Sequence, residues 1–228
     1  MKPSGILYLV ATPIGNLGDI TFRAVEILRT VDFVICEDSR RSGLLLKHFE
    51  IKKPLKTFHE HTSESKKNSI LEELTGGRNA ALITDAGTPL VSDPGFDLVR
   101  DAIAAGIEVQ SIPGPTAFVS ALIVSALPSH AFTFLGYLPQ KEKGRRDALT
   151  AVANEERTLI FYESPYRVQK TLKDMFEVLG DRNVSVSREM TKKFEETIRG
   201  KISEVLSQIA QKKILGEWVI VVQGKKDE

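Results

Sequence analysis

Between two hydrophobic runs the chain reads TDAGTPLVSDPG, residues 84–95. Proline, glycine, threonine and aspartate follow one another here in the mixture that builds special backbone turns. The run before the loop, residues 79–83, suits a buried strand, and the apolar residues within 96–103 recur at helical spacing. We therefore place this loop at the carboxyl end of a strand and predict that it binds a ligand.

The predicted helix after this loop has residues typical of helix termini at both ends. Asp93 suits the N-cap, Pro94 the first helical position, and Gly106 the position just past the last turn. A structural turn with a capped helix would account for Asp93 and Pro94. It leaves Asp85 and the amides around Gly87 unexplained, and these groups remain for a ligand.

Length and composition describe an ordinary globular protein. The chain has 228 residues, of which 42% are hydrophobic, enough to bury one large core or two small ones. No apolar stretch is long enough to span a bilayer, and the first residues lack a signal-peptide pattern, so we expect a cytoplasmic protein without membrane contact. Cys36 is the only cysteine and lies in an apolar run, which predicts a buried, inert thiol.

Strand-like and helix-like segments alternate in the first half. The expected strands are 6–11, 31–36, 79–84 and 108–112, and the expected helices are 21–30, 39–49 and 96–105. This order predicts an α/β fold with a mostly parallel sheet. In such sheets ligands bind at the carboxyl ends of the strands, so the loops 12–19, 37–41 and 85–95 should share one edge.

The segment PGPTA, residues 113–117, is the best candidate for a domain junction. We predict two α/β domains, the first over 1–113 and the second over 114–228. The second should contain strands at 131–137, 157–162, 183–187 and 217–222, with helices at 118–127, 147–154, 165–179 and 202–211. Ser164, Pro165 and Gly180 suit the cap, first residue and terminator of the third of these helices.

The net charge is only +1, but positive residues gather in one stretch. Its members are Arg40, Arg41, Lys47, Lys52, Lys53, Lys56, Lys66 and Lys67, with His48, His59 and His61 among them and Glu50, Glu60 and Glu64 in opposition. Two interpretations stay open: solvated helix faces, or a surface that contacts phosphates.

Several kinds of site are disfavoured. The loop after the first strand, 11–19, lacks the glycine pattern of a dinucleotide fold, its Pro13 removes an amide donor, and no P-loop motif occurs anywhere. The loops suit a small zwitterionic or cationic molecule better than a polyphosphate. The pair His59 and His61 has no third ligand in view, so we predict no metal centre. Glu37 ends a predicted strand inside the shared edge, where it suits a base, while Asp38 or Ser39 suits a helix cap.

Taken in order, eight motifs resemble the ribosomal RNA small subunit methyltransferase I family, a branch of the tetrapyrrole-methylase-like, class III S-adenosylmethionine-dependent methyltransferases. They are ATPIGNLGDIT (11–21), CEDSR (36–40), HEH (59–61), TDAGTPLVSDPG (84–95), IPGPTA (112–117), YESPYR (162–167), REMTKKFEE (188–196) and GEWVIVV (216–222). The resemblance implies two α/β domains with S-adenosylmethionine in the cleft between them, and a homodimer. The first domain, 1–113, would face RNA and form part of the cofactor cleft, and the second, 114–228, would bind cofactor and dimerise. The resemblance further implies 2′-O-methylation of a cytidine in the decoding region of 16S rRNA within the small ribosomal subunit.

The resemblance and the loop positions together nominate site residues. The expected cofactor-binding residues are Pro13, Ile14, Asp85, Gly87, Thr88, Pro115, Thr116 and Tyr162. The expected catalytic residues are Glu37, Glu163 and His59, of which Glu37 comes first as the acceptor of the ribose proton. The expected RNA-binding residues are Arg40, Arg41, Lys47, Lys66 and Lys67. The family usually has histidine where this chain has Tyr166.

Two alternatives remain. One is methylation of a tetrapyrrole or another small substrate, which would have no need of the basic stretch 40–67. The other is a non-catalytic RNA-binding assembly factor that keeps the fold without turnover. The TDAGTPLVSDPG and PGPTA loops favour a methyltransferase over the second alternative.

Overall fold

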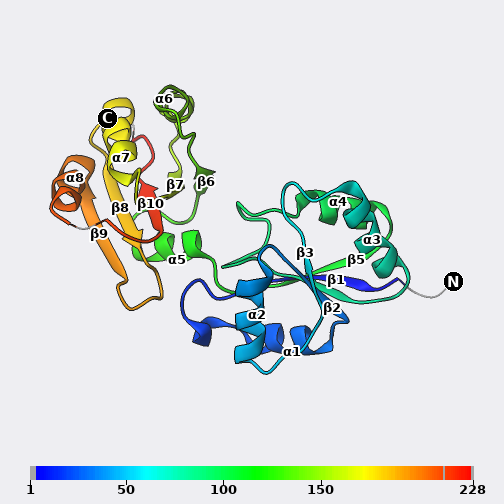
Figure 1. Ribbon diagram of the computed structural model, residues 1–228. Helices are drawn as coiled ribbons and strands as arrows, with labels where there is room; N and C mark the ends of the chain where they lie inside the picture. The colour runs from blue at the N-terminus through cyan, green and yellow to red at the C-terminus, as the bar shows by residue number, and fades with distance from the viewer. Residues whose placement is uncertain (1–3, 213, 227–228) are drawn as a thin grey trace. The chain divides into compact units, whose positions relative to one another are not determined.

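The computed structural model describes residues 4–212 and 214–226 (Figure 1). The chain divides into two compact units, the first ending at Thr116 and the second beginning at Ala117. The junction predicted from the sequence lies three residues earlier, between 113 and 114. Each unit is an α/β structure, in agreement with the predicted fold class.

The first unit is built on a five-stranded sheet in the order β3-β2-β4-β1-β5. Its strands are β1 (Ile6–Val10), β2 (Phe33–Cys36), β3 (Leu55–Thr57), β4 (Ala80–Leu82) and β5 (Glu108–Ile112). Every neighbouring pair is parallel, as the alternation of strands and helices predicted. The residues of β2 and β4 are all buried, because helices cover both faces of a parallel sheet.

Helices on the two faces enclose two separate cores. The helices are η1 (Leu17–Asp19), α1 (Phe22–Thr30), α2 (Ser39–His48), α3 (Glu64–Thr75) and α4 (Phe96–Ala104). Figure 1 shows α1 and α2 on one side of this sheet and α3 and α4 on the other. Leu28 and Leu46 belong to the first core, and Ile70, Leu74 and Leu98 belong to the second.

Because the strands are parallel, their carboxyl ends meet at one edge, as the sequence predicted. The loops after β1 and β4 are joined there by a bridge between Thr12 and Gly87. The amide of each residue donates to the carbonyl oxygen of the other, over 2.8 Å and 3.0 Å. These two bonds hold the predicted binding loop against the loop after β1.

The predicted capping residues of α4, Asp93 and Pro94, are wrong, although the expected helix 96–105 starts at the observed residue. The helix begins at Phe96, and Gly95 rather than Asp93 takes the cap position, with a φ of 125°. Leu90 and Ser92 also adopt positive φ, so the loop stays irregular past Pro94. A φ of 125° is strained for any residue with a side chain, and a Cβ there would also lie 2.9 Å from Leu90 Cδ2, so the position favours glycine. The predicted terminator Gly106 is confirmed, with a φ of 75°.

The sequence reasoning missed β3 and α3 in the basic stretch. The buried positions of α3 are Lys67, Ile70 and Leu74. Their spacing is helical, but a lysine in the first of them conceals the apolar stripe.

The second unit has a sheet in the order β6-β7-β10-β8-β9. Its strands are β6 (Phe132–Tyr137), β7 (Thr158–Glu163), β8 (Asn183–Arg188), β9 (Glu196–Lys201) and β10 (Trp218–Val222). Its helices are α5 (Ala117–Val124), α6 (Glu142–Ala151), α7 (Val168–Leu179) and α8 (Ile202–Ala210). Only β6 and β7 pair in parallel, and the other pairs are antiparallel.

Three details of the second unit differ from the prediction. The helix expected over 147–154 is α6, which runs from Glu142 to Ala151. The strand β9 was not predicted. The helix α7 begins at Val168 and not at Pro165, because the Ser164 carbonyl oxygen accepts from the amides of Arg167 and Val168 in a preceding turn. Gly180 ends this helix with a φ of 80°, as predicted. Within the described residues, no helix combines the length and apolar character needed to cross a bilayer.

A buried ion pair joins two helices of the second unit. Arg145 Nε donates to Asp174 Oδ2 over 2.6 Å, and the two side chains are only 5% and 8% exposed. Arg145 also donates to the Gln140 carbonyl oxygen, which connects α6, α7 and the turn before α6.

We predict that Asp174→Ala lowers the free energy of unfolding by about 3–5 kcal/mol, because it leaves the buried guanidinium of Arg145 without a counter-charge. Urea titration followed by circular dichroism measures this loss. Asp97→Ala is the matched control, since Asp97 forms an exposed pair with Arg100 and should cost less than about 1 kcal/mol. Equal losses in the two variants would contradict the prediction.

We predict that the Cys36 thiol does not react with iodoacetamide at pH 8 in the folded protein. Cys36 is fully buried, as the sequence predicted, and burial raises the pKa of its thiol above the ordinary value. A raised pKa lowers the fraction of thiolate, which is the reactive form. Mass spectrometry should detect alkylation only after denaturation, and rapid alkylation of the native protein would refute the prediction.

Candidate functional site

A pocket of about 240 Å³ lies at the carboxyl edge of the first unit's sheet. Its walls come from the loop after β1, from the first two turns of α2 and from the residues that follow β4. The lining residues are Thr12, Pro13, Gly15, Leu17, Arg41, Ser42, Leu44, Leu45, Thr84 and Asp85. Three loops that the sequence assigned to one edge therefore contribute to one cavity.

Three buried side-chain oxygens of this pocket have no hydrogen bond within the described part of the chain: Ser42 Oγ, Thr84 Oγ1 and Asp85 Oδ1. The last two belong to the predicted binding loop. The other carboxylate oxygen, Asp85 Oδ2, lies 3.2 Å from a terminal nitrogen of Arg41. Buried polar atoms are almost always hydrogen-bonded in folded proteins, so these atoms mark where a ligand can bind.

The loops after β1, β4 and β5 meet beside this pocket. Thr88 Oγ1 lies 3.2 Å from the Pro115 carbonyl oxygen and 2.6 Å from Thr116 Oγ1. Gly87 has a φ of 88°, and a Cβ there would lie 3.4 Å from Ile14 Cγ2. Seven of the eight cofactor-binding residues predicted from the sequence therefore lie on these loops of the first unit.

The eighth residue, Tyr162, belongs to the second unit. It stands near the end of β7, and its ring packs edge-on against Phe134 with centroids 5.0 Å apart. A second contact, at 5.6 Å, joins it to Tyr137. Tyr162 is therefore part of an aromatic cluster at the β6–β7 edge of its own sheet.

The sequence suggested a base and a helix cap among Glu37 and Asp38, and the structure shows that Asp38 is the cap. Asp38 caps α2, accepting from the Arg40 amide over 2.8 Å. Its bonds from the Arg40 side chain and amide lower the pKa of Asp38 to about 2. The preceding Glu37 is exposed at the same edge, and its carboxylate has no hydrogen bond or ion pair within residues 4–212 and 214–226. Glu37 thus remains open to a substrate.

His59 lies in the turn after β3, also at the carboxyl edge, and its ring is exposed. Its main-chain amide donates to Thr62 Oγ1 over 2.8 Å, which fixes the turn. Across the described residues, no three or more His, Cys, Asp or Glu side chains gather into a group that suits a metal ion.

Glu163 has a structural role that conflicts with its nomination as a catalytic residue. Its side chain is fully buried. Oε1 accepts from the Ser164 amide over 2.7 Å and from Arg167 over 2.8 Å, and Oε2 accepts from Thr171 Oγ1 over 2.6 Å. Because both oxygens are bonded within its own unit, Glu163 ties β7 to α7, and we withdraw it as a proton acceptor.

The predicted RNA-binding residues are placed differently from one another. Arg40 is exposed beside Asp38, and Lys47 is exposed on the last turn of α2. Lys66 Nζ donates to Thr57 Oγ1 over 2.6 Å at the edge strand β3. Arg41 is 69% exposed although it pairs with Asp85.

The nomination of Lys67 is wrong. Its side chain is only 9% exposed, and Nζ lies 2.6 Å from Asp101 and 3.0 Å from Glu64. Hydrogen bonds to these carboxylates raise the pKa of Lys67. Lys67 therefore joins α3 to α4 as an internal cation and presents no charge to RNA.

Some pocket residues escaped the sequence reasoning. Leu17 and Leu44 line the pocket while 41% and 70% exposed. Large apolar side chains left at a pocket rim indicate contact with a ligand or partner. Thr84 begins the binding loop, but the sequence did not predict it as a cofactor-binding residue. Its burial without a hydrogen bond is visible only in three dimensions.

Comparisons with known proteins agree with this geometry. Residues 6–206 match the family model described as Tetrapyrrole (Corrin/Porphyrin) Methylases. A protein of Thermotoga maritima named ribosomal RNA small subunit methyltransferase I is 47% identical over 222 residues, covering 97% of this chain and all of that protein. Proteins of the same name from Halalkalibacterium halodurans and Escherichia coli O157:H7 are 47% and 48% identical, covering 98% and 97% of this chain and 78% and 79% of their own lengths.

A solved structure supports the fold. The uroporphyrin-III-C-methyltransferase of Thermus thermophilus matches 96% of this chain and 94% of its own with a TM-score of 0.65, at 19% sequence identity. The match over residues 6–206 and the full-length relatives show that the chain belongs to the tetrapyrrole (corrin/porphyrin) methylase family, in the group named ribosomal RNA small subunit methyltransferase I.

Proposed function

We propose that this protein transfers a methyl group from S-adenosylmethionine to the ribose 2′-hydroxyl of a cytidine in the decoding region of 16S rRNA, within the small ribosomal subunit. Relatives that are 47–48% identical over nearly the whole chain are named ribosomal RNA small subunit methyltransferase I. The observation that supports the chemistry is the pocket at the carboxyl edge, where Asp85 and Thr84 hold unsatisfied oxygens.

The pocket fits S-adenosylmethionine in its chemistry. This cofactor carries a sulfonium, an ammonium and ribose hydroxyls, and it supplies an electrophilic methyl group when bound. Asp85 Oδ1 suits a donor from such a ligand, and Thr84 Oγ1 suits a hydroxyl. The further residues that we propose to hold it are Pro13, Ile14, Gly87, Thr88, Pro115, Thr116 and Tyr162.

We assign Glu37 the proton of the attacking hydroxyl. A ribose hydroxyl is a weak nucleophile while protonated, so an acceptor near it speeds attack by about 10²–10⁴. Glu37 is exposed at the carboxyl edge and forms no ion pair among the described residues. His59, on the neighbouring loop, is the second candidate for the proton acceptor. Alignment of the hydroxyl with the methyl group lowers the barrier further, by roughly 7–11 kcal/mol. The loops that position both reactants should therefore contribute more to the rate than the proton acceptor.

We assign the rRNA phosphates to exposed cations. Arg40, Arg41 and Lys66 lie around this edge, and Lys47 lies at the other end of α2. Arg41 contacts Asp85, so it lies where the proposed RNA and cofactor sites meet. We also propose a homodimer, from the family resemblance, and a cytoplasmic location, because small ribosomal subunits are there.

One alternative has a specific observation in its favour. The family model and the solved structure are both named for methylases of tetrapyrroles. The basic residues around the carboxyl edge favour RNA, since a tetrapyrrole has no row of phosphates. A non-catalytic assembly factor is disfavoured by the unsatisfied oxygens of the pocket, which such a factor would not need.

The test is transfer of tritiated methyl from S-adenosylmethionine to small ribosomal subunits that lack the modification, followed by nuclease mapping. We expect label at one decoding-region cytidine, resistant to alkaline cleavage because the 2′-hydroxyl is blocked. Label on another acceptor, or cofactor binding without transfer, would overturn the proposed substrate. An absence of cofactor binding would favour the assembly factor.

We predict that Asp85→Asn weakens S-adenosylmethionine binding by about 10- to 100-fold, because a hydrogen bond to a charged group is worth about 1.5–3 kcal/mol. Isothermal titration calorimetry measures the change. Asp38→Asn is the matched control: it removes a carboxylate from the same edge, retains the helix cap, and should leave cofactor affinity unchanged. An unaltered affinity in Asp85→Asn would remove Asp85 from the site.

We predict that Glu37→Gln lowers the turnover number by about 10²–10⁴ while cofactor affinity stays normal, because the amide cannot accept the proton. Single-turnover methylation of small subunits measures the rate. Glu60→Gln, an exposed carboxylate in the turn after β3, is the control. Full turnover in Glu37→Gln would show that the proton goes elsewhere, and His59→Gln would then be the next variant.

A further inference from the structure

The structure divides the basic stretch into bonded and unbonded cations. Lys56 pairs with Glu73, and Lys67 pairs with Asp101 and Glu64. The remaining lysines before β3 differ, since none forms an ion pair in the part of the chain that the structure describes. These are Lys47, Lys52 and Lys53.

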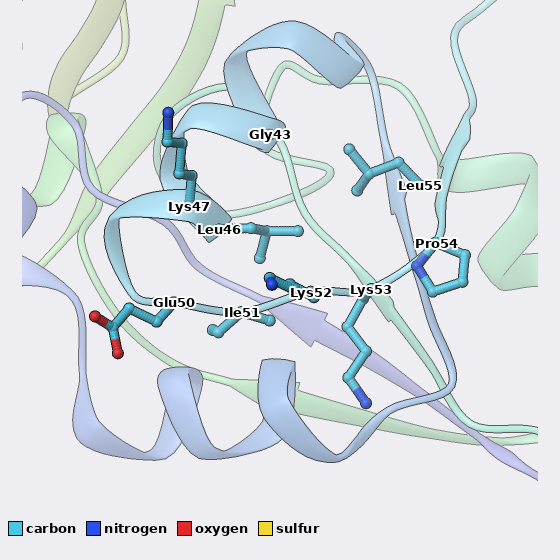
Figure 2. Close-up of a pocket in the computed structure, with 9 residues that line it drawn as sticks. All are labelled: Gly43, Leu46, Lys47, Glu50, Ile51, Lys52, Lys53, Pro54 and Leu55. Carbon is cyan, nitrogen blue, oxygen red and sulfur yellow. The ribbon is translucent and has the colours of Figure 1, made fainter.

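These three lysines border one pocket, of about 890 Å³ (Figure 2). It lies between the last turns of α2 and the segment that leads into β3. Its lining consists of Gly43, Leu46, Lys47, Glu50, Ile51, Lys52, Lys53, Pro54 and Leu55. Figure 2 shows Lys47 rising from the helix and Lys53 extending from the segment beyond, with Leu46 between them in this view. The lining thus combines an aliphatic floor with three cations and one carboxylate.

Gly43 supports the view that this pocket is kept open. It occupies the middle of α2, where glycine costs about 0.5–1 kcal/mol relative to alanine. Steric crowding does not require it, because a Cβ there would meet only Leu55 Cδ1 at 3.9 Å, an ordinary contact. Its φ is not among the positive values. The missing side chain instead leaves space beside Leu55, on the floor of the pocket.

The pocket stands at the opposite end of α2 from the candidate active site. Arg40 and Arg41 lie in the first turn of the helix, near the carboxyl edge, and Lys47 lies in its last turn. Ten helical residues separate the two ends by about 15 Å. The negative end of the helix dipole accounts for one cation at Lys47. It does not account for Lys52 and Lys53, which lie beyond the helix.

We propose that this pocket binds one nucleotide of the rRNA, outside the target site. Lys47, Lys52 and Lys53 contact its phosphates, and the base or ribose lies over Leu46, Ile51 and Leu55. This inference rests on the proposed function, and it adds a second anchor that holds the RNA one helix length away from the reacting cytidine.

The test compares two triple variants of the full chain for binding to small ribosomal subunits and to a 16S rRNA fragment over a range of KCl. Lys47→Gln/Lys52→Gln/Lys53→Gln removes the pocket cations. Lys143→Gln/Lys170→Gln/Lys173→Gln removes three exposed lysines of the second unit and is the matched control.

Each phosphate contact to a single strand contributes about 0.7 to the slope of log affinity against log salt. One nucleotide has two flanking phosphates, so we expect the pocket triple to lower the magnitude of this slope by about 1.4 and to weaken binding about 10- to 100-fold at 0.1 M salt. Cofactor affinity should not change in either variant, and the control should retain both slope and affinity.

A charge-neutral variant tests the floor of the pocket. Gly43→Leu places a side chain beside the pocket floor, since a Cβ there makes only an ordinary contact with Leu55, and it should weaken RNA binding several-fold without altering the salt slope. Thermal unfolding checks that it is folded.

Two results would overturn this inference without affecting the proposed function, provided that the wild-type protein methylates the small subunit. An unchanged slope in the pocket triple would show that no phosphate binds there. Weakened binding to the subunit with normal binding to naked rRNA would assign the pocket to a ribosomal protein. Failure of wild-type methyl transfer would instead reject the proposed function.

Discussion

The parallel pairing of β1 with β4 and β5, and of β4 with β2, is the constraint on which the candidate site depends. It sends all the loops at the carboxyl ends of the strands to one edge, whatever their separation along the chain. The bridge between Thr12 and Gly87 then fixes the binding loop against the loop after β1. Helices on both faces bury the sheet, so the edge remains the place where polar groups can meet a ligand.

Charge pairing decides which residues of the basic stretch can serve a partner. Lys67 stands on the buried face of α3, and two carboxylates neutralise it. Arg41, which the sequence predicted to bind RNA, contacts Asp85 and therefore also borders the cofactor pocket. In the second unit, Glu163 is likewise bonded to Arg167 and Thr171 and links a strand to a helix. Position along the sequence did not distinguish these internal charges from exposed ones.

The sequence predicted most strands, most helices and the shared edge, because alternation and apolar runs reflect local periodicity. It failed where a local signal was ambiguous. A lysine in the apolar stripe hid α3, and the charged strand β9 resembled a surface loop. The cap of α4 shifted to Gly95 because Leu90 and Ser92 adopt positive φ, which a capping pattern does not encode.

The amino-acid sequence by itself determined the fold class, the order of the motifs and the family resemblance, since these depend on residue types and their spacing. Only the tertiary structure decided which polar groups are satisfied. Asp85 Oδ1 and Thr84 Oγ1 lack partners, whereas both oxygens of Glu163 have them. A hydrogen bond depends on distance and direction between residues that lie far apart in the chain, and the sequence does not contain these quantities explicitly.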